Sequence, residues 1–360
     1  MLRSLSEAQN PMPDTLPTPT FEARLASARE TSIRLKRAIA QVIVGQDAVV
    51  EQVLWGLIAG GHVLLEGNPG LGKTLLVRTL SSCLDLRFSR IQFTPDLMPS
   101  DVTGTNVLVM DASAAAGPAG RFELHRGPIF GQVVLADEIN RATPKTQSAL
   151  LEAMQEHAVT IAGKRHALDE PFFVLATENP IEMEGTYPLP EAQLDRFLLK
   201  VSVPTPSEDE LTEILARTTG KPVGEPERVL SREDVRSLQA LCREIAVAEP
   251  VLRYAARLVN ASAADANDAP PLVRRAVRYG AGVRGAQSLI LASKAVALLE
   301  GRAHVAFADV HKTAAPVLRH RILLSFDGEA DGVSSDQIVS ELLASVPTRP
   351  EAVERAAQGT

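Results

Sequence analysis

The chain has 360 residues, which is longer than one typical domain and predicts two or three folded units. Its apolar content of 45% and charged content of 22% are those of an ordinary globular protein. A formal net charge of −7 without a long lysine or arginine run argues against general binding to nucleic acid or an anionic membrane. No apolar stretch reaches the roughly 20 residues of a membrane span. Glu7, Gln9 and Asn10 stand where a signal peptide has its apolar core, so the expected location is cytoplasmic.

Residues 1–20 contain several prolines among polar side chains and cannot bury enough apolar surface to fold. We expect a disordered leader there, followed by an α/β unit over 21–203. A helix is expected to begin near Phe21. Residues 42–46 are interpreted as a hinge into a second helix at 47–59.

Residues 67–74 match the phosphate-binding pattern G-x-x-x-x-G-K-[ST] at every fixed position. The loop follows a predicted buried strand at 62–66 and precedes a predicted helix, so its backbone N–H groups gather at the positive helix end. The Lys73 ammonium adds positive charge, and the Thr74 hydroxyl is a ligand for Mg²⁺. We therefore predict binding of a nucleoside triphosphate. The loop residues are Gly67, Asn68, Pro69, Gly70, Leu71, Gly72, Lys73 and Thr74.

Cys83 and Cys242 are the only cysteines, and they are far apart in the sequence. Neither belongs to a spaced metal-binding or redox motif. We expect two buried free thiols in a reducing compartment.

A hairpin is predicted as an insertion in the α/β unit. Residues 86–93 alternate apolar and polar side chains as a strand does. Two short β runs then follow at 105–110 and 120–124. The Ala/Gly-rich segment 111–119 between them is predicted to be the exposed tip of the hairpin.

Asp137 and Glu138 end an apolar strand predicted at 132–138. In P-loop enzymes, acidic residues at the carboxyl edge of the sheet hold Mg²⁺. Two acids at a strand end are also typical of an ordinary turn, but the phosphate loop upstream favours the functional interpretation. Asp137 is expected to bind the water shell of the metal, and Glu138 to polarise the attacking water.

Asn179 follows another buried strand, predicted at 171–177. Before that strand we expect a helix capped by Thr143 and a small hairpin at 159–168. An asparagine at this strand end can hydrogen-bond both the lytic water and the γ-phosphate. The turn expected at Asn179-Pro180 is compatible with that role.

Arg196 stands just before a strand predicted at 197–203. Without further context, a surface ion pair is the favoured explanation for such an arginine. Pro204 and Pro206 then mark a domain boundary.

The second domain is predicted to be helical over 204–327, with helix starts at the capping residues Ser207 and Ser231. Arg284 falls in the first turn of one of its helices, where a positive charge opposes the helix dipole. This position indicates that Arg284 faces an anion. Residues 328–360 are expected to be a C-terminal tail with a possible short helix at 334–344.

As a set, these motifs resemble the MoxR family of AAA+ ATPases. The resemblance rests on 67–74, on the long stretch 127–156, and on 176–182 and 185–197, and it extends over about 43–323. It implies an α/β fold, with a P-loop AAA+ domain containing a five-stranded parallel sheet plus a second, all-α lid domain. It also implies a homo-oligomer, usually a hexameric ring, with ATP and Mg²⁺ at each subunit junction.

The resemblance also assigns roles to residues of this chain. Lys73 and Thr74 match Walker A, Asp137 and Glu138 match Walker B, Asn179 matches sensor 1, Arg196 matches the arginine finger, and Arg284 matches sensor 2 of the lid. A finger supplied by a neighbour can raise the rate ~10³ to 10⁵-fold. Family members often have Gly-Ala-Ser-Pro-Arg before the sensor 2 helix, whereas this chain has Gly-Ala-Gly-Val-Arg at 280–284. Arg126 and Arg141 are alternative candidates for the finger, because each adjoins a motif.

The favoured function is Mg²⁺-dependent ATP hydrolysis that drives chaperone-like remodelling of a client protein. The resemblance implies a client with a von Willebrand factor A domain, and the hairpin tip at 111–119 is the expected client contact. One alternative is a DNA-acting motor or loader, against which the acidic net charge counts. A non-hydrolysing, nucleotide-gated scaffold is the other alternative.

Overall fold

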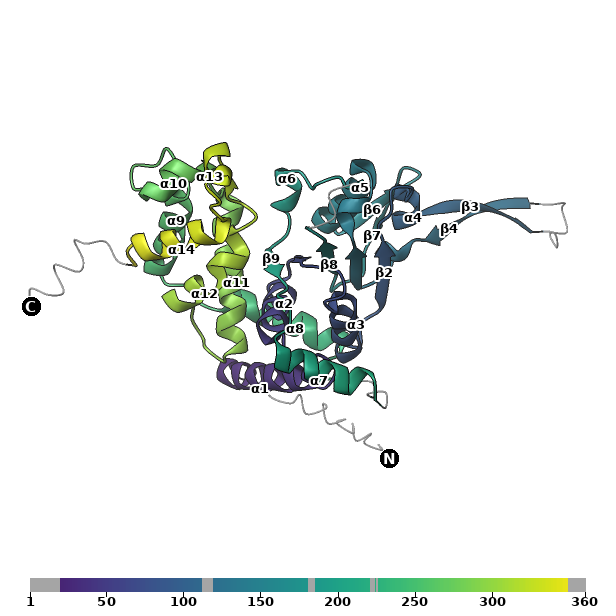
Figure 1. The fold of residues 1–360 in the computed structure, drawn as a ribbon. Helices are drawn as coiled ribbons and strands as arrows, with labels where there is room; N and C mark the ends of the chain where they lie inside the picture. The colour runs from purple at the N-terminus through teal and green to yellow at the C-terminus, as the bar shows by residue number, and fades with distance from the viewer. Residues whose placement is uncertain (1–19, 112–118, 181–184, 221–223, 225, 349–360) are drawn as a thin grey trace, which may run out of the picture.

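The computed structural model describes residues 20–111, 119–180, 185–220, 224 and 226–348 (Figure 1). Residues 1–19 of the expected leader and residues 112–118 of the expected hairpin tip lie outside the described residues. Within the described part, the chain forms an α/β body, a projecting hairpin and a mainly helical lobe.

A five-stranded parallel sheet forms the centre of the α/β body, as predicted. Its strand order is β2-β5-β8-β1-β9. The strands are β1 (Val63–Glu66), β2 (Phe88–Gln92), β5 (Val133–Asp137), β8 (Phe173–Glu178) and β9 (Leu199–Ser202). The inner strands are almost continuously apolar because helices cover both faces of a parallel sheet.

Successive strand residues pack into two different cores on the two faces of the sheet. Leu65 lies in the core formed with α1, α2 and α3, whereas Leu64 lies in the core formed with α4 and α5. This alternation follows from the two-residue period of a strand. The helices of the body are α1 (Phe21–Ala40), α2 (Asp47–Ala59), α3 (Lys73–Cys83), α4 (Pro99–Thr103), α5 (Pro144–Glu156) and α6 (Glu191–Leu194).

The helix cap predicted at Thr143 is present in position but not in its hydrogen bond. Thr143 occupies the N-cap of α5, but its side chain makes no capping hydrogen bond to the helix.

Cys83 and Cys242 are buried free thiols as expected, and burial raises the pKa of Cys83 to about 11. No helix of the described part is long and apolar enough to cross a membrane.

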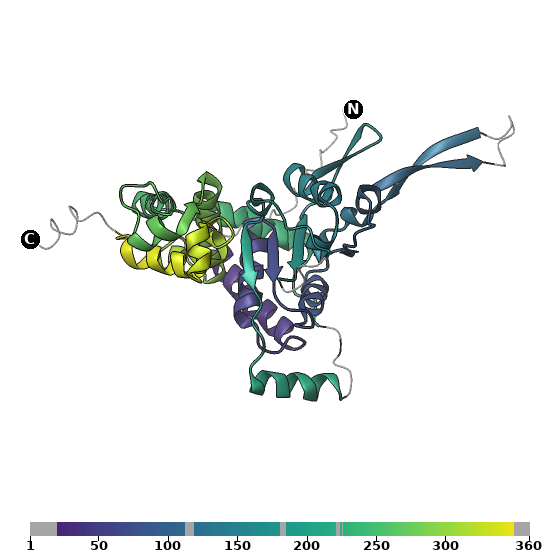
Figure 2. The same ribbon diagram turned by 45° about the horizontal axis from the view of Figure 1, so that its top comes forward.

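The two predicted hairpins are both present. The larger one pairs β3 (Gly104–Asp111) with β4 (Ala119–Arg126), and the smaller one pairs β6 (Ala158–Ile161) with β7 (Lys164–Ala167). Figure 1 and Figure 2 both show the larger hairpin projecting far from the body. Its strands expose Leu108 and Phe122, the latter by 74%. Such apolar exposure away from any core marks a surface suited to a binding partner.

The second lobe is helical, with one short addition. Capping boxes start α7 and α8 at Ser207 and Ser231, as predicted. The helices after β9 are α7 (Glu208–Thr218), α8 (Arg232–Glu244), α9 (Glu249–Ala261), α10 (Pro271–Ala276), α11 (Val283–Leu299), α12 (Phe307–Leu318), α13 (Phe326–Ala330) and α14 (Ser335–Ser345). Of these, α7 lies apart from the lobe, against the α/β body. An antiparallel ribbon of β10 (Val277–Tyr279) and β11 (Leu323–Leu324) was not predicted, because strands this short leave no alternation to detect.

The last helix, α14, belongs to the helical lobe. Ile338, Val339 and Leu342 are buried on it, and α14 packs against α9 and α12. The boundary expected at 327 therefore falls inside the lobe, because an amphipathic helix after that point buries its apolar face on the preceding ones. Residues 349–360 lie outside the described part.

Candidate active site

The phosphate loop joins the end of β1 to the start of α3, as the sequence predicts. Gly70 and Gly72 have positive φ angles of 81° and 76°, and a Cβ added at either would meet nothing within 4 Å. Glycine is favoured there because other residues adopt this backbone poorly. The open space on the loop and the N-terminus of α3 form a cradle that fits a chain of phosphates.

Lys73 is folded back onto the loop. Its Nζ donates to the carbonyl oxygen of Gly67 and, at 3.4 Å, to that of Glu178. Partial burial lowers the pKa of Lys73, although nearby carboxylates, Asp137 first among them, act in the opposite direction. The ammonium therefore lies between the loop and the acidic strand ends, where it can follow a phosphate oxygen.

Thr74 and Asp137 meet at the same point of the site. The Thr74 hydroxyl donates to Asp137 Oδ2 at 3.3 Å, and the Thr177 hydroxyl donates to Asp137 Oδ1 at 2.7 Å. Hydroxyl and carboxylate oxygens are the ligands that Mg²⁺ prefers, directly or through water. The donor set therefore fits the metal that the sequence predicts.

Two further residues of this site were missed by sequence reasoning, and both lie on β2. The Arg90 guanidinium contacts Asp137 Oδ2 at 2.6 Å, and the Gln92 amide donates to Glu138 Oε2 at 2.8 Å. β2 pairs with β5 so that Gln92 stands opposite Asp137. The sequence did contain one signal for them. Arg90 and Gln92 are two residues apart near the end of a predicted strand, so their side chains lie on the same face.

Glu138 has a left-handed backbone with φ of 57°. This conformation is uncommon for a residue other than glycine and is a typical form of strain at functional sites. The Glu138 backbone N–H donates to the Thr177 hydroxyl at 2.9 Å. Its carboxylate also forms an ion pair with Arg141 at 3.2 Å. Arg141 therefore contacts the acidic residue of its own chain.

Asn179 lies at the same edge, directly after β8. It is 6% exposed, and its carbonyl oxygen accepts a hydrogen bond from the Asn140 amide at 3.4 Å. Because β8 lies between β5 and β1, Asn179 stands between the acidic pair and the phosphate loop. The structure thus brings together the loop, Asp137, Glu138 and Asn179.

Arg196 lies at the amino ends of the parallel strands, opposite to the phosphate loop at their carboxyl ends. It precedes β9. Two residues later, the Leu198 N–H donates to the carbonyl of His62, which stands just before β1. At about 3.3 Å per residue, β1 separates this point from Gly67 by roughly 16 Å. Among the described residues Arg196 makes no side-chain ion pair.

Arg284 lies beside Arg196 and away from the phosphate loop. Both residues line one small cavity, and Arg284 forms a 3.6 Å ion pair with Asp195. The buried Arg321, 2% exposed, holds the other oxygen of Asp195 at 2.8 Å. Arg196 and Arg284, which the sequence associates with a nucleotide, therefore lie together. The length of the strands separates both from the phosphate loop of their own chain.

Arg126, the other alternative finger, lies at the base of the long hairpin. Its guanidinium stacks over the Phe130 ring, 5.1 Å from the centroid. It lies on β4, which pairs with β3 outside the central sheet.

A cavity of about 160 Å³ adjoins the phosphate loop. Its walls come from the segment 42–46, from the loop, and from α7, and they include Ile43, Leu75 and Ile214. The Gln46 amide donates to the Leu71 carbonyl at 2.9 Å and fixes the segment against the loop. An apolar cavity beside a phosphate cradle fits the base of a nucleotide. Sequence reasoning interpreted 42–46 only as a hinge.

Comparisons with known proteins agree with this geometry. The family model of the ATPase family associated with various cellular activities (AAA) matches residues 62–199, and that of the AAA lid domain matches 271–342. Chaperone MoxR1 of Mycobacterium tuberculosis is 42% identical over 315 residues, covering 87% of this chain and 81% of its own length. Protein MoxR of Methylorubrum extorquens is 30% identical over 343 residues, covering 90% of this chain and 96% of its own.

The chain belongs to the MoxR family of AAA+ ATPases. A crystal structure of a candidate ATPase from Cytophaga hutchinsonii is 38% identical to this MoxR-family chain. It superposes with a TM-score of 0.82 and covers 91% of this chain and 97% of its own. The family and fold predicted from the motifs are therefore confirmed, and the relatives support an ATPase with a chaperone-like role.

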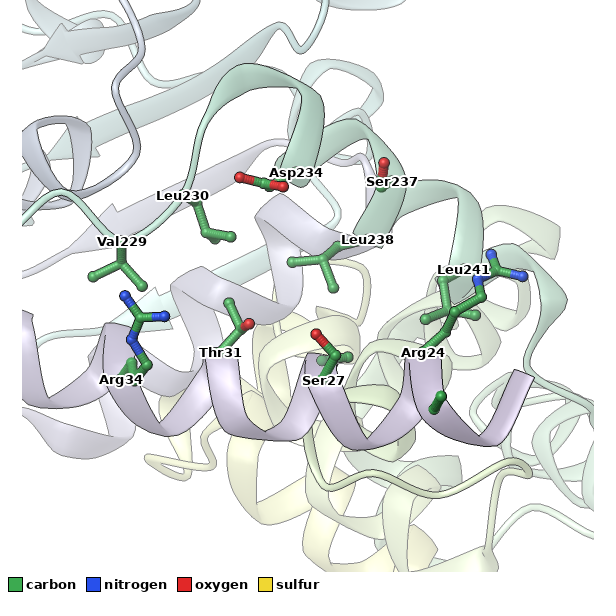
Figure 3. Close-up of a pocket in the computed structure, with 12 residues that line it drawn as sticks. Arg24, Ser27, Thr31, Arg34, Val229, Leu230, Asp234, Ser237, Leu238 and Leu241 are labelled. Carbon is green, nitrogen blue, oxygen red and sulfur yellow. The ribbon is translucent and has the colours of Figure 1, made fainter. Parts of the chain in front are cut away.

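A larger cavity of this MoxR-family protein lies elsewhere, between α1 and α8 (Figure 3). It measures about 390 Å³, and its lining mixes leucines with hydroxyl and charged side chains. Its two arginines are already paired, Arg24 with Glu244 at 2.8 Å and Arg34 with Glu227 at 3.4 Å. The remaining polar side chains of the lining are Ser27, Thr31, Asp234 and Ser237.

Proposed function

We propose that this protein is a Mg²⁺-dependent ATP hydrolase whose active site is completed by a second copy of the chain. One observation supports this most directly. The phosphate loop, Asp137 and Glu138 lie at the carboxyl edge of the sheet, whereas Arg196 and Arg284 lie at the amino edge. The arginines of one chain cannot meet the triphosphate bound by that same chain.

Within one subunit, the loop holds the phosphates of ATP and the apolar cavity at 42–46 holds its base. Glu138 orients the attacking water and takes its proton, and Asn179 fixes the water relative to the γ-phosphate. Thr74 and Asp137 would hold Mg²⁺, which would supply positive charge to offset that of the phosphates. Lys73 adds a positive charge from the loop.

The neighbouring subunit supplies Arg196 to the developing charge on the γ-phosphate, and Arg284 lies close enough to share that role. Contact between the amino edge of one copy and the carboxyl edge of the next is heterologous, so it generates a ring if the rotation closes. The family resemblance gives six as the number of subunits. Figure 1 shows α6, which precedes Arg196, at the opposite end of the molecule from α7.

Hydrolysis in such a ring is proposed to remodel a client protein in the cytoplasm. The chaperone-like role follows the relatives, and a client with a von Willebrand factor A domain follows the family resemblance. The projecting β3–β4 hairpin, with Leu108 and Phe122 exposed, is the proposed client contact. Acidic net charge does not favour DNA as the client.

Mixing two inactive variants tests the shared site. Glu138→Gln disables the carboxyl edge, and Arg196→Ala disables the amino edge. In a mixed ring, some junctions combine an intact Glu138 from one variant with an intact Arg196 from the other. We expect phosphate release from the mixture and not from either variant alone. A fully active Arg196→Ala protein, or a mixture without activity despite mixed assembly, would overturn the proposal.

A further inference from the structure

Three charged side chains form a partly buried cluster next to the phosphate loop. Lys200 Nζ lies 2.8 Å from Glu66 Oε1 and 2.8 Å from Glu178 Oε1. The three side chains are 17%, 29% and 15% exposed, in the order Lys200, Glu66 and Glu178. A partly desolvated cluster of this kind is sensitive to the loss of any member, because the remaining charges are left unpaired.

Lys200 separates two carboxylates that the sheet places side by side. Glu66 and Glu178 are paired residues of the neighbouring parallel strands β1 and β8, so their side chains leave the same face. Burial raises the pKa of Glu178, and the ammonium of Lys200 acts against that rise. Without Lys200, two like charges would face each other close to the place where a triphosphate binds.

The cluster is bonded to the loop through the backbone. Glu66 is followed by Gly67, whose N–H donates to the Glu178 carbonyl at 3.4 Å. The same carbonyl accepts from Lys73 Nζ. Glu178 in turn precedes Asn179. A change in this cluster would therefore move the first residue of the loop, the loop lysine and the sensor asparagine together.

Lys200 lies on β9, and Arg196, the proposed arginine finger, lies three residues before this strand begins. Between these points the lid holds the backbone of β9. Arg321 donates to the carbonyl of Leu198 at 3.2 Å, and Arg319 donates to that of Lys200 at 3.4 Å. Asp195, which is partly exposed and adjoins Arg196, is paired with the buried Arg321. The segment 195–200 thus runs from the proposed finger, past the lid, to the base of the phosphate loop.

We propose that Lys200 is a positioning residue that sets the phosphate loop and Asn179 for ATP and links them to the finger strand. The proposal rests on the proposed ATPase function. It assigns Lys200 no contact with substrate. Its effect is electrostatic and geometric, since it fixes two acidic strand ends that would otherwise repel each other and the phosphates.

Three variants test the role. Lys200→Met removes the charge and keeps most of the side-chain length, Lys200→Arg keeps the charge, and Lys200→Met with Glu178→Gln restores the net charge of the cluster. We measure binding of a fluorescent ATP analogue and phosphate release. Lys200→Met is expected to bind the analogue about tenfold more weakly. Lys200→Arg and the double variant are expected to recover most of that loss.

The dependence on pH distinguishes positioning from simple packing. In Lys200→Met the facing carboxylates of Glu66 and Glu178 should share a proton at a higher pH than usual. Lowering the pH from about 8 to about 6 should therefore restore part of the analogue binding in this variant, relative to wild type. Lys73, whose ammonium interacts with Glu66 and Glu178, is present in both proteins, as are Arg319 and His320 near Lys200.

The outcomes separate the two proposals. If wild-type protein neither binds nor hydrolyses ATP, the ATPase function fails. If wild type is active and Lys200→Met binds and turns over ATP like it at every pH, only the role of Lys200 fails. A folded Lys200→Met protein that the double variant does not rescue would also overturn it. Thermal unfolding of each variant shows which proteins are folded.

Discussion

The two edges of the central sheet are built from different chemistry. At the carboxyl edge, the strands end in Glu66, Asp137 and Glu178, and the polar contacts of these acids are made within the same α/β body. At the amino edge, Arg196 and Arg284 surround Asp195, and the lid supplies Arg321. At the carboxyl edge the acids are balanced by cations of the same body, whereas at the amino edge arginines from two lobes surround one acid.

On the proposed function, this difference means that neither edge is a complete active site. The carboxyl edge has the loop and the oxygens proposed to hold Mg²⁺, but two arginines described there, Arg90 and Arg141, are paired with Asp137 and Glu138. The amino edge has arginines without a phosphate cradle.

Removal of the finger should have the largest effect. Arg196→Ala is expected to lower turnover by about 10³-fold or more with ATP binding nearly unchanged, because the arginine acts on charge that develops during reaction. Steady-state phosphate release and binding of an ATP analogue measure the two quantities. Arg126→Ala is the matched control and should keep turnover. If Arg126→Ala is the inactive variant instead, the amino edge loses its assigned role.

Acid should weaken the amino edge through His62. Burial lowers the pKa of His62 to about 4, and its Nδ1 accepts a hydrogen bond from Val174 N–H at 3.1 Å. The unfolded chain therefore binds a proton between pH 6.5 and about 4 when the folded chain does not. Stability is full above pH 6.5 and should fall by about 3 kcal/mol as the pH drops to 4.

Urea unfolding at several pH values measures this slope, and His62→Gln should flatten it. His320, also buried with its pKa lowered, retains its own share of the slope in the variant. An unchanged slope in a folded His62→Gln protein would show that the loss of stability arises elsewhere.

Unpairing Arg321 should destabilise the junction between lid and body. Asp195→Asn leaves a buried guanidinium without its carboxylate, which is expected to cost about 2 kcal/mol because Asp195 itself is partly exposed. Denaturant unfolding gives the value. Glu249→Gln, which breaks the fully solvated pair with Arg253, serves as the control and should change stability by less than about 0.5 kcal/mol. Equal losses in both variants would contradict the special role of the buried pair.

Changes on the hairpin should have the smallest effect on the isolated protein. Phe122 is 74% exposed, so Phe122→Ser should alter stability by no more than about 0.5 kcal/mol and leave basal ATPase activity unchanged. Stimulation of the ATPase by a client should be lost. A drop in basal activity would mean that the hairpin supports the sheet edges and not client binding.

The sequence predicted those parts of the site that depend on local pattern. The phosphate loop, Asp137, Glu138 and Asn179 each follow a buried strand, and parallel strands bring such ends to one edge. Arg90 and Lys200 could not be assigned in this way, because their partners are set by strand order and register, which residue spacing does not contain.

The position of the lid was also beyond sequence pattern. Arg284 was correctly predicted near a helix start, but its place beside Arg196 depends on how α11 and Arg321 pack against β9. Similarly, α7 was predicted as a helix, but its return to the phosphate loop, where Ile214 completes the apolar cavity, is a tertiary contact.

The backbone of Glu138 carries a consequence for evolution of the protein. A side chain held at φ of 57° costs of order 1 kcal/mol or more, and glycine would adopt the same turn without that cost. Selection for thermal robustness alone would favour glycine at this position. The glutamate found there therefore lowers the stability of the fold, as expected of a residue whose side chain serves a role other than folding.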